Sequence, residues 1–260
     1  MINKVFSSFD DAVADIPDGA SVAAECWGYP ATPQNLIAAL KRRGARDLTV
    51  ITHTFIPMVF SEEDAVLPSL LLPQMKKLIT SIAGIMRLGA GAFLQEYVEK
   101  GLEVEIVGHG TLAARLQAGA LGLGGIYDPI GIGTMLEEGK EKRVIKGKEY
   151  LFQEPIEPDY AFICAHKADK LGNLVFKGGY RGDQPAMAMA AGTTIVETDE
   201  IVEVGDIDPE HVVVPGAFVD RIIEIPESGY GTPEKGAKLI GLLSQVDSVR
   251  DLLFGKVEEG

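Results

Sequence analysis

Short, largely apolar runs alternate with amphipathic segments along most of this chain. The runs at 21–26, 48–52 and 160–165 are short and rich in small, β-branched or aromatic residues, which is typical of buried strands. Between the first two, Leu36 and Leu40 repeat at helical spacing. Further strands are expected at 78–81, 103–107, 174–176, 193–196, 211–214 and 218–225, and further helices at 90–100, 111–118, 184–191 and 233–254.

This alternation predicts an α/β fold with an open, largely parallel sheet flanked by helices. Residues 143–152 instead form two short β-prone runs about Lys146-Gly147-Lys148, which predicts a small surface hairpin. The helix after residue 31 is expected to begin with Thr32 as its cap and Pro33 as its first residue. No repeat or linker interrupts residues 1–260, so we expect a single domain, with the irregular segment 55–74 as a cover or interface arm.

The segment 119–139, GALGLGGIYDPIGIGTMLEEG, is unusual because seven of its 21 residues are glycine. Glycine allows positive φ and lets the backbone approach a neighbour that a Cβ would repel. We expect an ordered loop that wraps a ligand or a partner chain, and a structural crossover without a ligand is the alternative. The candidate substrate-binding residues in this segment are Gly122, Gly124, Gly125, Tyr127 and Gly131.

Composition and charge narrow the function classes. The chain has 38 Asp and Glu against 24 Lys and Arg, a net charge of −14, which argues against a nucleic-acid or anionic-membrane surface. No apolar run reaches the ~18 residues of a membrane span, and the N-terminus lacks a signal-peptide core, so we expect a cytoplasmic protein. Cys26 and Cys164 lie far apart, and no His, Asp or Glu spacing predicts a metal site.

A series of short motifs, in order over most of the chain, resembles the A (α) subunit of the family I coenzyme A transferases. Each motif is weak alone, and their order and spacing make the resemblance specific. They are Asp18-Gly19, Thr32-Pro33, 47–50 (DLTV), 110–113 (GTLA), 127–134 (YDPIGIGT), 138–140 (EGK), 165–169 (AHKAD), 172–174 (GNL), 185–188 (PAMA) and 215–220 (PGAFVD).

The resemblance implies a CoA-transferase-like fold and an enzyme that moves CoA between an acyl-CoA and a free carboxylic acid. The CoA thioester is then a substrate, and no tightly bound cofactor is expected. The nucleophile of this family is a glutamate in a Ser-Glu-Asn-Gly motif of the B (β) subunit. It attacks the thioester, and its motif does not occur in this chain. A separate B subunit is therefore the expected partner, in an αβ or an α2β2 assembly.

Departures from the family pattern supply the candidate catalytic residues. The family usually has Gly-Gly-Phe where this chain has Glu25-Cys26-Trp27, Asn where it has His53, and Gln where it has His109. An Arg-Asn-Phe-Asn-Pro stretch is replaced by residues 181–185, RGDQP. His53 and His109 are candidate hydrogen-bond donors to a substrate oxygen. Glu25 is a candidate base or nucleophile, or a structural carboxylate. Gly28 is a further candidate for substrate binding.

Two other functions are compatible with these residues. Glu25, His53 and His109 would suit acid–base work with water, as in a CoA-thioester or carbon–carbon bond hydrolase on the same fold. A non-catalytic module that binds sugar phosphates or CoA esters is the other alternative, since fold alone does not decide function.

Overall fold

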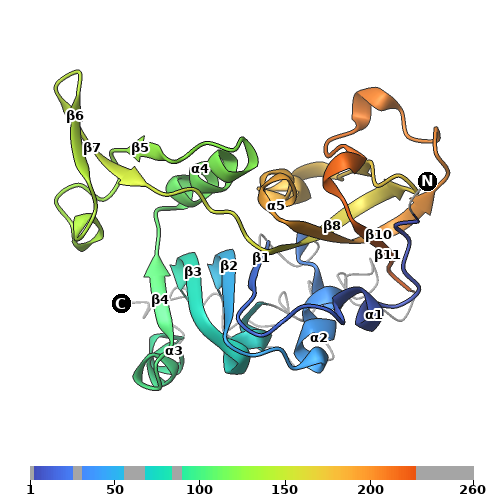
Figure 1. The fold of residues 1–260 in the computed structure, drawn as a ribbon, viewed down its shortest axis with the longest axis horizontal. Helices are drawn as coiled ribbons and strands as arrows, with labels where there is room; N and C mark the ends of the chain where they lie inside the picture. Colours follow the sequence, from blue (N-terminus) through green and yellow to red (C-terminus); the bar gives the residue numbers. More distant parts are fainter. Residues whose placement is uncertain (1–2, 26–30, 56–67, 84–89, 227–260) are drawn as a thin grey trace, which may run out of the picture.

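The computed structural model describes residues 3–25, 31–55, 68–83 and 90–226, with only the backbone described at 90–93 and 179–180. A large sheet has the strand order β11-β10-β8-β1-β2-β3-β4, and every neighbouring pair on this path is parallel (Figure 1). The strands are β1 (Ser21–Ala24), β2 (Leu48–Phe55), β3 (Met75–Ala83), β4 (Glu103–Ile106), β8 (Tyr160–Asp169), β10 (Thr193–Val202) and β11 (Arg221–Glu224), with β9 (Leu174–Val175) antiparallel to β8. The expected open α/β sheet is confirmed.

The strand order indicates where in this sheet a ligand would bind. The chain runs outward from β1 through β2, β3 and β4, then returns to β8 on the other side of β1 and continues to β10 and β11. In open α/β sheets, ligands bind at the carboxyl ends of the strands where the order reverses in this way. The carboxyl ends of β1, β2 and β8 are therefore the first place to look for a site.

Helices cover both faces of the sheet, as Figure 1 shows. They are α1 (Phe9–Val13), α2 (Gln34–Arg43), α3 (Ala90–Glu99), α4 (His109–Ala120) and α5 (Gln184–Ala190), with 3-10 turns at Pro68–Gln74, Met135–Glu137, Gly178–Arg181, Pro209–His211 and Gly216–Phe218. Successive strand residues point to opposite faces. Accordingly Phe162 belongs to the core that includes Leu36 of α2, while Ile163 belongs to the core that includes Leu112 of α4 and Met187 of α5.

Residues at the ends of α1 and α2 form the caps that their residue types favour, with one exception. The Ser8 hydroxyl accepts a hydrogen bond from Asp11 N at 3.1 Å and caps α1. Gly44 ends α2 with φ of 75°, as expected for a C-terminal glycine. The expectation for Thr32 is wrong by one position, since Pro33 occupies the cap of α2 and makes no side-chain capping bond.

A second, antiparallel sheet has the order β5-β7-β6, from β5 (Ile126–Asp128), β6 (Lys142–Ile145) and β7 (Lys148–Gln153). It projects beyond the β4 side of the large sheet, next to α4 (Figure 1). The predicted hairpin is confirmed. Lys146 and Gly147 have φ of 52° and 77°, the positive pair that a two-residue type I′ turn requires.

One expected strand is wrong. Residues 211–214 do not form a strand: Pro209–His211 is a 3-10 turn, and Val214 makes only an isolated bridge with Leu174. Asp208 explains the turn, because its Oδ1 accepts Glu210 N at 3.0 Å and caps it. The helix expected at 233–254 lies outside the described residues, as does 56–67 of the candidate cover. In the part of the chain that is described, no helix has the length and apolarity to span a membrane.

Candidate functional site

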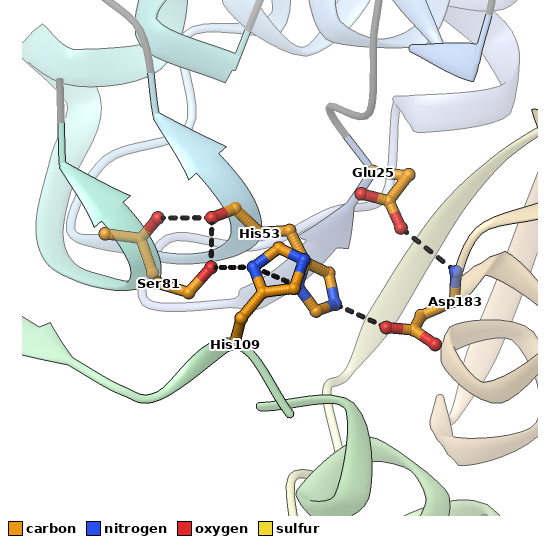
Figure 2. A network of polar contacts seen from close by, with 6 residues as sticks. Glu25, His53, Ser81, His109 and Asp183 are labelled. Atoms are coloured by element: carbon orange, nitrogen blue, oxygen red, sulfur yellow. Dashed lines mark hydrogen bonds and ion pairs between the residues drawn. The ribbon is translucent and has the colours of Figure 1, made fainter. Parts of the chain in front are cut away.

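Four ionisable side chains and a serine converge where the strand order reverses, as Figure 2 shows. Glu25 follows β1 directly, His53 lies near the carboxyl end of β2, and Ser81 lies near that of β3. His109 is the first residue of α4, and Asp183 immediately precedes α5. Five separate elements therefore build one site at the carboxyl edge of the sheet.

His53 is the centre of this network. Its side chain is only 2% exposed, and its Nε2 lies 2.6 Å from Asp183 Oδ2. That contact does not have hydrogen-bond alignment, so Nε2 is buried next to a carboxylate oxygen without donating a well-directed bond. On the other side, His53 Nδ1 lies 3.4 Å from His109 Nδ1, and the ring centroids are 4.4 Å apart.

Ser81 links the two histidines. Its hydroxyl donates to the His53 carbonyl oxygen at 2.6 Å and lies 2.6 Å from His109 Nδ1. A serine has one proton, so when that proton goes to the carbonyl, His109 Nδ1 must be the donor to Ser81 Oγ. This assigns the Nδ1–H tautomer to His109. Burial, followed by the neighbouring His53, lowers the pKa of His109, which favours this neutral form.

Glu25 is held by a tight loop. Its carboxylate is 1% exposed and accepts a hydrogen bond from Asp183 N at 3.2 Å. Gly182 has φ of 47°, and a Cβ at this position would lie 3.0 Å from Glu25 Oε2. Glycine is therefore required at 182 both for the backbone conformation and for the approach of the loop to Glu25.

These residues line a polar pocket of about 250 Å³, formed by Glu25, His53, His109, Gly182 and Asp183. A second, more apolar pocket of about 340 Å³ lies between α4 and α5 and shares Gly182 and Asp183 with the first. Its other lining residues are Gln117, Ala120, Leu121, Pro185, Ala186 and Met189. A polar pocket that adjoins an apolar one suits a ligand with a reactive polar group and an aliphatic or similar remainder.

The structure brings together the three predicted catalytic candidates, Glu25, His53 and His109. Gly28 lies outside the described residues. The candidates of the glycine-rich segment lie on the small sheet and its connections, and none lines the polar pocket. Their role in binding a ligand or a partner stays a prediction.

Packing within the chain accounts for part of the glycine-rich segment. A Cβ on Gly125 would lie 2.4 Å from Phe152, and one on Gly131 would lie 3.0 Å from Leu136 Cβ. A Cβ on Gly122 or Gly124 would meet nothing within 4 Å. Tyr127 donates to Glu141 Oε1 at 2.5 Å, and its ring packs edge-on against Phe152.

Sequence reasoning did not place two members of the network. Asp183 had a signal, because it lies in the stretch 181–185 that departs from the family pattern. Ser81 had none, since its importance depends on β3 lying beside β2, in a register that pairs Thr80 with Thr52. All four ionisable residues of the site fall at departures from that pattern.

A sequence profile of the family described as Coenzyme A transferase matches residues 6–225. The A subunit of 3-oxoadipate CoA-transferase from Pseudomonas putida is 37% identical over 225 residues, which are 86% of this chain and 95% of the relative. The alpha subunit of acetate CoA-transferase from Escherichia coli K12 is 34% identical over 223 residues, covering 85% of this chain and 97% of the relative.

Solved structures agree on the fold. The acyl-CoA transferase YdiF of E. coli O157:H7, as its thioester complex with CoA, superposes with a TM-score of 0.72 at 24% identity. The match covers 89% of this chain and 49% of that one, so this chain spans about half the length of that enzyme. A variant of the decarboxylase AibA/AibB gives a TM-score of 0.70 at 24% identity, with 97% and 98% coverage. The sequence matches confirm the expected A-subunit type, and this chain belongs to the coenzyme A transferase family.

Proposed function

We propose that this chain is the A subunit of a two-subunit CoA-transferase that moves CoA between an acyl-CoA and a free carboxylic acid. The observation that carries the proposal is the similarity, over 85–86% of this chain, to chains named as A or alpha subunits of such enzymes. Two of these names specify 3-oxoadipate or 3-ketoacid substrates, so a 3-oxo acid is the acyl group that we propose. The CoA thioester is a substrate in this scheme and no resident cofactor is invoked.

The nucleophile belongs to the partner in this proposal. These 260 residues contain no Ser-Glu-Asn-Gly motif, so a separate B subunit supplies the glutamate that attacks the thioester. A carboxylate nucleophile forms covalent intermediates and divides one difficult transfer into two easier steps. We propose a cytoplasmic αβ or α2β2 assembly, in which the B subunit delivers its glutamate to the polar pocket of this chain.

The geometry suggests how this chain contributes. His53 and His109 line the polar pocket, where an N–H donor of the buried His53 ring would stabilise negative charge that develops on a thioester oxygen. The lowered pKa of His109 favours a neutral ring, and because its one proton lies on Nδ1 toward Ser81, its Nε2 is left as a hydrogen-bond acceptor. The apolar pocket between α4 and α5 adjoins this position and would take the acyl chain.

The test is reconstitution from separately purified subunits. This chain alone should show no CoA transfer, and turnover should appear when the B subunit is added. Replacing Ser81 by Ala removes the hydrogen bonds to the His53 backbone carbonyl and to His109 Nδ1, and should lower kcat by about 10-fold or more while the fold is retained. CoA transfer by the single chain would contradict the proposal, and CoA release without an acceptor acid would indicate a thioester hydrolase instead.

A further inference from the structure

Three potential metal ligands meet in the polar pocket. Glu25, His53 and Asp183 each offer one ligand atom, and these atoms all lie within 4.8 Å of one another. We propose that these three residues form a binding site for a divalent transition-metal ion of the Zn²⁺ type. The site goes beyond the CoA transfer proposed above, because that reaction is assigned to a partner's glutamate and requires no metal.

His53 gives the first argument. Buried ring nitrogens nearly always have a hydrogen-bond partner, and an unsatisfied one is costly. His53 Nε2 is buried and makes no aligned hydrogen bond, although Asp183 Oδ2 is only 2.6 Å away. Zinc binds imidazole nitrogen and carboxylate oxygen at about 2.0–2.2 Å, so two such ligands on one ion lie roughly 3–3.5 Å apart. If His53 and Asp183 moved slightly apart, one ion could therefore bind both His53 Nε2 and Asp183 Oδ2.

Charge gives the second argument. The polar pocket is lined by two carboxylates, two histidines and Gly182, and no Lys or Arg is among its lining residues in the described part of the chain. Glu25 is 1% exposed, so solvent screens it poorly from Asp183. A divalent cation in this pocket would be attracted by both carboxylates, and a neutral imidazole is the form of histidine that binds metals.

The scaffold fixes two of the ligands before any ion binds. Asp183 occupies the N-cap position of α5, where an aspartate commonly accepts a backbone N–H, yet it makes no capping bond. Its side chain contacts His53 instead, while its backbone N–H holds Glu25 (Figure 2). Gly182 leaves room for the Glu25 carboxylate at 3.0 Å from where a Cβ would be. A preorganised set of this kind is what a metal site requires.

Ligand type selects the ion. One imidazole nitrogen and two carboxylates suit Zn²⁺ or Mn²⁺, and Zn²⁺ binds such a set more tightly than Mn²⁺ does. Mg²⁺ prefers oxygen ligands and keeps several waters, so it should bind much more weakly. Three protein ligands leave a position open toward the pocket, where a carbonyl or carboxylate oxygen of a substrate would coordinate.

The experiment measures metal binding and does not depend on transferase activity. The tag-free chain is treated with a chelator, and Zn²⁺ binding is followed by equilibrium dialysis with metal analysis. We expect one Zn²⁺ per chain, and we expect Mg²⁺ at the same concentration not to compete. Co²⁺ is used as a second probe, because its visible absorption reports coordination by nitrogen and oxygen ligands.

Variants locate the ion. His53→Asn and Asp183→Asn each remove one ligand and should weaken Zn²⁺ binding by at least about 100-fold. The matched control is Asp199→Asn. Asp199 forms a similar pair with His166 at 2.9 Å, but the Asp199 side chain is 48% exposed and the His166 side chain 30% exposed. This control should bind Zn²⁺ as the unmodified chain does. Circular dichroism checks that each variant is folded.

Two results would overturn the proposal. The first is the absence of stoichiometric Zn²⁺ binding by the folded chain, alone and with its B subunit. The second is Zn²⁺ binding that is unchanged in both His53→Asn and Asp183→Asn, which would place the ion elsewhere. Neither result bears on CoA transfer, which reconstitution tests separately.

Discussion

A buried glutamate holds the start of α2, and its replacement gives the sharpest stability prediction. Glu197, on β10, is 0% exposed, and its Oε2 accepts Leu36 N at 2.9 Å while its Oε1 accepts the Asn35 side-chain amide at 3.0 Å. The first N–H groups of a helix have no partner within the helix, and Pro33 at the cap supplies none. A side chain from the sheet thus takes the place of a local cap.

The protonation of Glu197 determines how strongly the free energy of unfolding depends on pH. Burial raises its pKa from 4.5 to about 8, in spite of the hydrogen bonds from Leu36 and Asn35, which act in the opposite direction. A carboxyl whose pKa is higher in the folded state keeps its proton there after the unfolded chain has lost it. Stability therefore falls as pH rises from about 4.5 to about 8. With these two values, the free energy of unfolding should drop by about 3–4 kcal/mol between pH 5 and pH 8.

Urea unfolding of the unmodified chain and of Glu197→Gln is compared at several pH values between 5 and 8. The glutamine does not titrate, so it should lack this pH-dependent loss. At pH 5 it should be less stable by about 1–3 kcal/mol, because its –NH2 cannot accept the hydrogen bond from Leu36 N. The difference should shrink as pH rises and change sign by about pH 8. Glu200→Gln, at a 51% exposed position on the same strand, is the control.

A difference between the unmodified chain and Glu197→Gln that does not change with pH would contradict this account. If the unmodified chain instead became more stable than Glu197→Gln as pH rises, Glu197 would be an ionised carboxylate in the folded protein. The backbone donors of α2 would then stabilise the carboxylate by more than burial destabilises it.

Further predictions concern packing. Gly125→Val should destabilise the small sheet by roughly 1–3 kcal/mol or more, because φ is +136° and a Cβ would lie 2.4 Å from Phe152. A Cβ on residue 124 would meet nothing within 4 Å, so the free energy of unfolding of Gly124→Val should lie within about 0.5 kcal/mol of that of the unmodified chain. A loss of reconstituted turnover in Gly124→Val without a loss of stability would support contact with a ligand or partner, and equal destabilisation by both variants would contradict the packing account. Phe162→Ala should cost about 3–5 kcal/mol in urea unfolding, because this side chain is fully buried in the central strand β8, and a cost below 1 kcal/mol would contradict its role in the core.

The order and type of most elements follow from the amino-acid sequence. Alternating apolar runs and helical repeats reveal strands and helices because each must bury one face or stripe. Glycines added detail: Gly44 ends α2 and Gly147 belongs to the hairpin turn, since glycine adopts positive φ readily. The strand expected at 211–214 was wrong because Asp208 caps a 3-10 turn at Pro209–His211, and the short apolar run after it does not pair as a strand.

The assembly of the site, by contrast, depends on the three-dimensional arrangement of the strands. Glu25, His53 and His109 were identified along the chain, but their convergence requires the reversal of strand order about β1. Asp183 and Ser81 complete the network through neighbours that are distant in sequence. Periodicity reports which face of an element is buried, whereas contacts between elements depend on which strands lie side by side and in which register.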